Sequence, residues 1–255
     1  MISKNSIKLI KSLALKKQRT KENLFLVESD KNVIEVLNSK YIIVKLFATD
    51  TFIYNYENEC KNAASVIEVE QVEIKKASLL QNPQNCLAIC SIPEKLPFPE
   101  KLGNNLSIYL NDIQDPGNLG TIVRICDWFN IEYIFCSPNT VDFYNPKVIQ
   151  ASMGSFCRVQ LLETDFEQVA NLAQSSQTPV YGAFMDGKNI YTEKLPKKAI
   201  LIMGNEGNGI NKKLENNIDI KVKIPEFSDK DKSTESLNVS VATAIICSEF
   251  KRQIF

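Results

Sequence analysis

The stretch that decides the fold lies near the middle of the chain. Residues 111–124 read NDIQDPGNLGTIVR and follow the apolar run of residues 107–110. The apolar run predicts a short buried strand, DPGN predicts a turn, and residues 121–129 predict a helix that starts beside Asn118. We therefore expect a binding loop that presents Asn118 and Arg124 together near the start of that helix.

The rest of the second half alternates in the same way. Residues 166–173 hold apolar spacing typical of a helix, with Thr164 as its expected cap, and SLNVSVA opens a last apolar-striped helix at residue 236. Strands are expected near residues 107–110, 132–136, 157–162, 180–184, 199–203 and 220–224. This order predicts a mostly parallel α/β sheet with ligands at the carboxyl ends of its strands.

The first half also alternates, and it predicts a small α/β sandwich. Its expected strands are residues 24–27, 42–47, 66–69 and 86–90, with helices between them. Three prolines and a glycine in residues 91–103 indicate a semi-rigid linker. We therefore predict a first domain at 1–95, a linker at 96–104 and a second domain at 105–255.

Composition excludes several kinds of chemistry. The 255 residues include no histidine, which excludes Ser-His-Asp hydrolysis, His-ligated zinc and His-based acid–base catalysis. The seven cysteines are odd in number and scattered, so they favour reduced thiols over a disulfide framework. We expect no metal site.

The chain shows no apolar run of about 18 residues and no signal-peptide core, so we expect no membrane span and a cytoplasmic protein. Net charge is zero, but the first 21 residues hold seven basic side chains and no acidic one. Such a run fits either a solvated helix face or a surface that contacts RNA phosphates.

A second loop of interest is GNEGNG at residues 204–209, after the apolar run of residues 200–203. It matches neither G-x-G-x-x-G nor a P-loop, so nicotinamide and ATP sites are poorly supported. Glycine lets the backbone approach a ligand closely, although a simple glycine-rich turn has the same composition.

Taken in order, the motifs at 111–124, 200–210 and 236–242 resemble the SpoU (TrmH-type) RNA ribose 2′-O-methyltransferases of the SPOUT superfamily. The resemblance implies a catalytic domain with a deep trefoil knot, S-adenosyl-L-methionine as methyl donor, and a homodimer. The first half resembles, more loosely, the ribosomal-protein-L30e-like substrate-binding domain of longer family members, which grips folded RNA.

The resemblance also implies site residues. Gly204, Ile224 and Leu237 match positions that wrap the cofactor, and Glu206 matches an acidic residue that organises the site. Asn118, Ser236 and Asn238 match the neutral donors and acceptors around the target ribose, although capping and turn formation use the same residue types.

Arg124 matches the arginine that the family places at the target ribose as general base. Neutralising a guanidinium at pH 7 costs roughly 7 to 9 kcal/mol, because its pKa is about 12.5 to 13.8. We therefore expect Arg124 to hold the adjacent phosphate and the developing alkoxide instead.

The chain departs from the family after Ile224-Pro225, where the segment before Ser236 is about four residues longer and lacks the usual glycine. We expect this segment to be mobile and polar and to weaken cofactor binding. The leading interpretation is an RNA ribose 2′-O-methyltransferase, with ribosomal RNA favoured over transfer RNA. One alternative is an RNA-binding protein of the same fold with weak or lost turnover, and a more distant one is a small-molecule enzyme.

Overall fold

The computed structural model describes residues 1–94, 96–228 and 236–254. It contains two compact units, Met1–Glu94 with Asp142–Cys157, and Lys95–Val141 with Arg158–Phe255. Residues 142–157 therefore pack with the first unit, although they lie between strands of the second in sequence.

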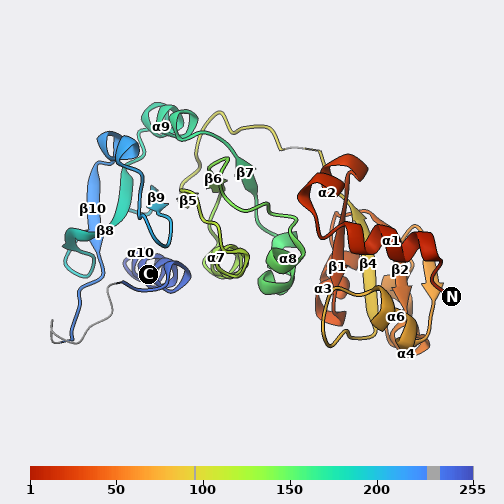
Figure 1. Ribbon diagram of the computed structural model, residues 1–255. Coiled ribbons are helices and arrows are strands. Elements are labelled where there is room, and N and C mark those ends of the chain that lie inside the picture. The colour runs from red at the N-terminus through yellow and green to blue at the C-terminus, as the bar shows by residue number, and fades with distance from the viewer. Residues whose placement is uncertain (95, 229–235, 255) are drawn as a thin grey trace. The chain divides into compact units, whose positions relative to one another are not determined.

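The first unit is built on a four-stranded mixed sheet of order β1-β4-β2-β3 (Figure 1). Strand β4 runs antiparallel to both β1 and β2, and β2 pairs in parallel with β3. The strands are β1 (Leu24–Glu28), β2 (Ile43–Ala48), β3 (Val66–Glu68) and β4 (Cys86–Ser91). The predicted α/β sandwich is confirmed.

Short helices surround this sheet, and Ile10, Leu13, Phe47 and Leu87 belong to a buried cluster in this unit. The helices are α1 (Lys4–Ser12), α2 (Lys16–Glu22), α3 (Asp30–Leu37), α4 (Asp50–Asn55), α5 (Glu57–Cys60), α6 (Gln71–Ala77) and α8 (Pro146–Ser152), with a 3-10 turn η1 at Ser155–Cys157.

One member of the basic leader is buried. Arg19 is 2% exposed, and its guanidinium donates to the carbonyls of Leu13 and Ala14 and pairs with Asp142. It therefore holds the first unit together and is not available to RNA. The six lysines of the leader are exposed: Lys4, Lys8, Lys11, Lys16, Lys17 and Lys21.

The second unit contains a six-stranded sheet of order β10-β8-β9-β5-β6-β7 in which every pairing is parallel. Its strands are β5 (Leu106–Leu110), β6 (Ile134–Cys136), β7 (Leu161–Glu163), β8 (Val180–Asn189), β9 (Ala199–Met203) and β10 (Ile220–Lys223). The parallel α/β prediction is confirmed.

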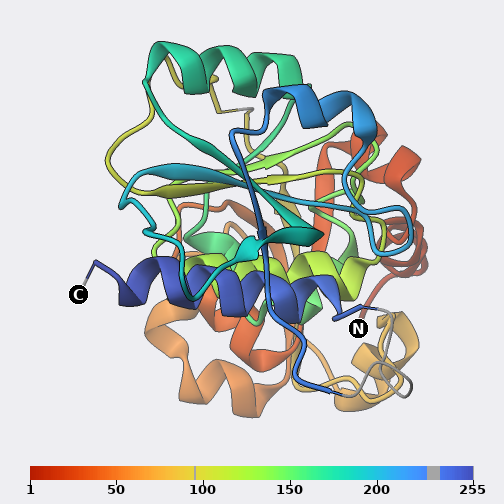
Figure 2. The ribbon, with the colours of Figure 1, turned by 90° about the vertical axis from the view of Figure 1, so that its left-hand side faces the viewer.

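Helices cover both faces of this sheet. Figure 2 shows α9 (Phe166–Ser175) and the 3-10 helix η2 (Lys212–Asn217) on one face, and α7 (Pro116–Trp128) beside α10 (Val239–Arg252) on the other. A sheet covered on both faces needs apolar residues at successive positions, and β5 and β9 are buried throughout.

Several local predictions were wrong. The DPGN run is the first turn of α7, because the Asp115 side chain caps the helix by accepting from Asn118 N at 2.8 Å and Pro116 takes the first turn. Helix α9 begins after Asp165, so Thr164 is not its cap. Strand β8 runs to Asn189 because β10 pairs with it again beyond a register shift.

Candidate active site at the carboxyl ends of the parallel strands

Three loops leave the carboxyl ends of β5, β9 and β10, as the sequence predicted. Strands β5 and β9 are paired from Leu106↔Ala199 to Leu110↔Met203, so the loops that follow them start side by side. Asn111 N donates to Met203 O at 2.9 Å and continues this pairing one residue past β5.

A hydrogen-bond chain joins the three motifs. Asn118 Nδ2 donates to Glu206 Oε1 at 2.9 Å, and Asn118 Oδ1 accepts from Asn238 Nδ2 at 2.9 Å. Asn238 Oδ1 in turn accepts from Ser240 N at 2.9 Å and caps α10. A carboxylate can only accept, so each amide has one workable orientation in this chain of bonds.

Asn205 organises the glycine loop, a role that was not predicted from the sequence. Its backbone exchanges two hydrogen bonds with Gly209, and its Oδ1 accepts from Gly207 N at 2.9 Å and Asn208 N at 3.0 Å. Its Nδ2 donates to Asp112 O at 2.7 Å. An asparagine that bonds the backbone ahead of it is typical of such turns, so its place between Gly204 and Gly207 was the available signal.

Close packing against the backbone of Gly209 and Ile210 explains why residue 204 is a glycine. A Cβ at Gly204 would lie 2.3 Å from the carbonyl carbon of Gly209 and 2.4 Å from Ile210 N. Gly209 itself has φ +67°, a conformation that favours glycine. The loop therefore folds back on itself at a separation that no side chain at Gly204 could occupy.

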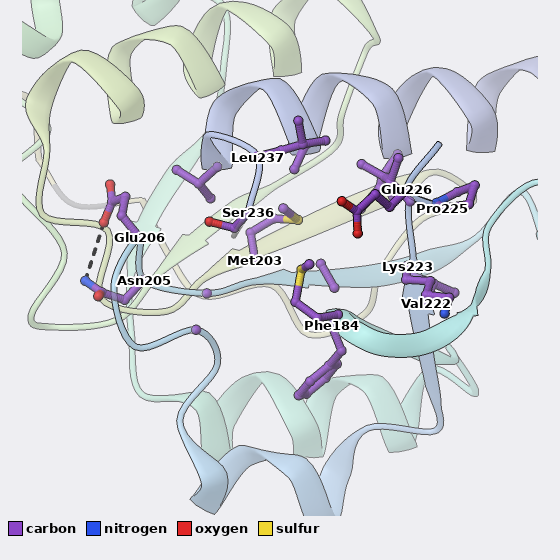
Figure 3. A pocket seen from close by; sticks show the side chains of 18 of the residues that line it. Phe184, Met203, Asn205, Glu206, Val222, Lys223, Pro225, Glu226, Ser236 and Leu237 are labelled. Atoms are coloured by element: carbon purple, nitrogen blue, oxygen red, sulfur yellow. Dashed lines mark hydrogen bonds between the residues drawn. The ribbon is translucent and has the colours of Figure 1, made fainter. Parts of the chain in front are cut away.

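A cavity of about 590 Å³ opens against this loop. Figure 3 shows Asn205 and Glu206 at one end, Glu226 and Pro225 at the other, and Met203 and Ser236 between them. Among the predicted site residues, five line it: Gly204, Glu206, Ile224, Ser236 and Leu237. Most of its apolar wall was not predicted from the sequence; it is formed by Phe184, Met203, Val222, Ala242 and Ile246.

A lysine side chain holds in place the ring of Phe184, one of the residues that line the cavity. Lys221 Nζ lies 4.4 Å from the centre of the Phe184 ring and donates to Glu215 Oε2 at 2.7 Å. This hydrogen bond raises the pKa of Lys221, with Coulomb attraction from Glu215 adding to it, so the side chain stays charged. The charge holds the ring by a cation–π contact.

The lining fits S-adenosyl-L-methionine. Its apolar side chains suit the flat adenine, the backbone groups of Gly204–Gly209 suit polar edges, and the carboxylates of Glu206 and Glu226 suit a positively charged ligand. A nucleoside cofactor held partly by backbone groups also requires the close approach that Gly204 provides.

Arg124 is not brought together with this site. It is exposed on α7 and has no hydrogen-bond or ion-pair partner among the residues that the structure describes. Six residues along a helix separate it from Asn118 by about 9 Å and by about 120° around the axis. Neither Arg124 nor Asn118 lines the cavity, so their joint presentation to the substrate stays a prediction.

The structure describes only part of the lengthened segment after Pro225. Residues 226–228 follow the cavity wall, whereas residues 229–235 lie outside the described part of the chain. The expected mobility of that segment and its effect on cofactor affinity therefore stay predictions.

Comparison with protein-family models gives residues 105–248 as a match to the "SpoU rRNA Methylase family". This chain belongs to the SpoU family. It is therefore a methyltransferase, with S-adenosyl-L-methionine as the methyl donor, and the resemblance predicted from its motifs is confirmed. Residues 4–88 match an "MRM3-like substrate binding domain". This match supports the prediction that the first unit is a substrate-binding domain.

Relatives share both halves of this SpoU chain. It is 29% identical over 92% of both chains to the 23S rRNA (guanosine(2553)-2′-O)-methyltransferase RlmP of Bacillus subtilis. A solved structure from Porphyromonas gingivalis, assigned to the TrmH family of RNA methyltransferases, is 36% identical over 99% of both chains, with a TM-score of 0.85. An AdoMet-bound rRNA methyltransferase from Sinorhizobium meliloti, 24% identical over 100% of this chain and 97% of its own, shares the fold with a TM-score of 0.86.

Within residues 1–94, 96–228 and 236–254, every helix is too short or too polar to span a bilayer. The same residues hold no group of three or more His, Cys, Asp or Glu side chains placed to hold a metal ion.

Proposed function

We propose that this SpoU methyltransferase modifies the ribose 2′-hydroxyl of a nucleotide in ribosomal RNA, within the large-subunit 23S-type RNA. The observation that carries the proposal is the hydrogen-bond chain from Glu206 through Asn118 to Asn238, which abuts the cavity through Glu206. The Bacillus subtilis relative, which matches both halves of the chain, is a 23S rRNA 2′-O-methyltransferase, and this supports a ribosomal substrate.

Glu206 and Asn118 serve as positioning groups in this proposal. Glu206 lines the cavity, and its carboxylate fixes the Asn118 amide, which in turn fixes Asn238 at the start of α10. When bound, S-adenosyl-L-methionine supplies the electrophilic methyl group. The protein's own contribution is to hold the 2′-hydroxyl in line with that group, which can account for a large part of the rate.

Arg124 is assigned to the RNA side of the site. A planar guanidinium with no partner in the described structure is free to bind a phosphate in a bidentate manner. We propose that it holds the phosphate next to the target and the developing alkoxide, and that the proton leaves through water. A neutral guanidine would cost roughly 7 to 9 kcal/mol, so Arg124 is a poor general base.

We also propose a homodimer in which the paired α7 and α10 faces meet. Trp128 on α7 is 84% exposed and Val241 on α10 is 47% exposed, and the two helices lie side by side (Figure 2). Exposed large apolar side chains on adjacent elements are typical of an interface. Such pairing would let Arg124 of one protomer serve the site of the other, which explains why it does not line its own cavity.

We also propose the trefoil knot of the family at the cofactor site, where residues 222–228, the glycine loop and residues from Ser236 onward line one cavity. Free thiols at all seven cysteines fit the cytoplasm. The six exposed lysines of the leader are proposed to contact RNA phosphates.

The test is incubation with methyl-labelled S-adenosyl-L-methionine and ribosomal RNA from cells that lack the gene. The RNA is then digested and searched for labelled 2′-O-methylnucleosides, with Arg124→Ala as the control that should abolish the label. Absence of label with intact RNA and demonstrated cofactor binding would favour the alternative, an RNA-binding protein without turnover. The intact chain of bonds through Asn118 speaks against that alternative.

A further inference from the structure

A second cavity, of about 410 Å³, adjoins the glycine loop in the second unit. Its lining comes from Asn111, Asp112 and Gln114, after β5, and from Asn205 and residues 208–212, after β9. Asn205, Asn208 and Gly209 line this cavity and also the larger one. The glycine loop is therefore a wall that the two cavities share.

The chemistry of the second cavity differs from that of the first. Its lining side chains are mainly neutral amides, with one acid, Asp112, and one base, Lys212, and Ile210 is the one apolar side chain among them. A cavity that binds a highly charged metabolite is expected to have more charged side chains in its lining. One that binds an apolar ligand is expected to have mostly apolar side chains there. Amides that offer both donors and acceptors match the edge of a nucleobase.

Asn111 gives the cavity a free donor. The residue is 4% exposed, and its Oδ1 accepts from Asn211 N at 2.8 Å. Its Nδ2 has no partner among the residues described and is not one of the fully enclosed side-chain atoms that lack one, so it keeps access to the cavity that Asn111 lines. The backbone bond to Asn211 fixes the amide, so the Nδ2 group is held ready for an acceptor on a ligand.

Other lining amides are equally available. The side chains of Gln114 and Asn208 make no hydrogen bond in the described structure, and Asn211 Nδ2 is also without a partner there. The cavity also lies next to the site: Asn205 Nδ2 bonds Asp112 O at 2.7 Å and contacts Glu206 Oε2 at 3.4 Å. A ligand in it would lie beside the chain of bonds through Asn118.

We propose that this cavity binds an unstacked base of the RNA substrate, at or next to the methylated nucleotide. Asn111 Nδ2 donates to an acceptor on the base edge, and the Gln114 and Asn208 side chains hydrogen-bond the other polar atoms of that edge. Lys212 pairs with the backbone phosphate. Sequence-specific readers of RNA use unstacked bases in this way. The inference rests on the proposed function, and it makes Asn111 and Gln114, which line this cavity but not the larger one, determinants of specificity that do not bind the methyl donor.

The test uses the isosteric substitution Asn111→Asp, which keeps the acceptor for Asn211 N but replaces the free donor with an oxygen. A second variant, Gln114→Ala with Asn208→Ala, removes only side chains without partners. Asn216→Ala is the matched control, because Asn216 is an exposed amide of the same unit that lines neither cavity. Cofactor affinity is measured by calorimetry, and kcat and KM are measured with ribosomal RNA.

We expect kcat/KM for RNA to fall about 5- to 150-fold in Asn111→Asp, the range of a lost base contact, with cofactor affinity within twofold of wild type. Short RNAs that carry each of the four bases at the mapped nucleotide and its neighbours give a second readout. Wild type should discriminate at one position, and Asn111→Asp should lose or change that discrimination there.

Two outcomes would overturn the inference, and they are distinguishable. If wild type labels ribosomal RNA but Asn111→Asp and the double variant match the Asn216→Ala control in both readouts, the base cavity is refuted while the proposed function stands. If wild type binds the cofactor but labels no RNA, the proposed function fails and this inference fails with it.

Discussion

Asn118 Oδ1 accepts a hydrogen bond from Asn238 Nδ2 at 2.9 Å across 120 residues of sequence. This bond ties the start of α7 to the start of α10, and the other end of the Asn118 amide is bonded to Glu206. A single amide therefore sets the geometry of all three motifs, so it is the most informative position to change.

Replacing Asn118 with Asp should impair turnover more than cofactor binding. The new carboxylate could still accept from Asn238 but would face Glu206, replacing a charge-assisted bond of about 1.5 to 3 kcal/mol with repulsion. We expect kcat to fall by at least about tenfold, with calorimetric affinity for S-adenosyl-L-methionine nearly unchanged. Thr121→Ala, which removes an exposed hydroxyl bonded within α7, is the control and should retain activity.

Substitutions of Arg124 should lower methyltransferase activity without lowering the stability of the fold. Because its side chain is exposed and without a partner in the described structure, Arg124→Ala should change the free energy of unfolding by no more than about 0.5 kcal/mol while abolishing methylation. Arg124→Lys keeps the charge but not the planar fork, so it should also be strongly impaired in single-turnover assays. Near-normal turnover of Arg124→Lys would show that the bidentate geometry is not needed.

Two glycines of one loop should respond differently. Gly204→Ala would force a Cβ to within 2.3 Å of the Gly209 carbonyl carbon, whereas Gly207→Ala would meet only Asn205 Oδ1, at 3.6 Å. We expect calorimetry to show loss of cofactor binding in Gly204→Ala and retention in Gly207→Ala. Equal affinities in the two variants would mean that the loop opens freely and that its close packing does not shape the cavity.

Arg19 and Lys17 should behave differently although they lie two residues apart in the basic leader. Arg19→Met leaves Asp142 without its partner and removes bonds to two carbonyls, which should cost about 3 to 5 kcal/mol of stability in chemical unfolding. Lys17→Met should leave stability unchanged and reduce the salt dependence of RNA binding, because Lys17 is exposed. A stable Arg19→Met variant would contradict the structural role.

Glu28 should make the protein less stable as pH rises. Burial raises the pKa of this carboxyl above its usual 4.5, against the lowering effect of hydrogen bonds from Ser78 and Leu79. The folded state therefore holds a proton that the unfolded state has lost, and that stabilisation disappears as pH rises from 4.5 through the raised pKa. Glu28→Gln should be more stable than wild type at pH 7 to 8, and the gain should shrink toward pH 4 in thermal unfolding.

The sequence by itself determined the order of elements and the motifs. Apolar runs such as residues 106–110 and 199–203 are long enough to specify buried parallel strands, and the polar residues that follow each run mark where the loops leave the sheet. Asn118, Glu206 and Asn238 could be named as site residues only because the motifs after these runs resemble, in their order, those of the SpoU family.

The tertiary structure decided which residues meet. Local periodicity does not encode long-range register, so it could not show that residues 142–157 pack with the first unit, that Arg19 is buried against Asp142, or that Arg124 is not part of the cavity lining. The amide-lined cavity around Asn111 also exists only because β5 and β9 are paired, which places segments about 100 residues apart side by side. Side chains from such segments form a site only when the pairing of distant strands brings them together.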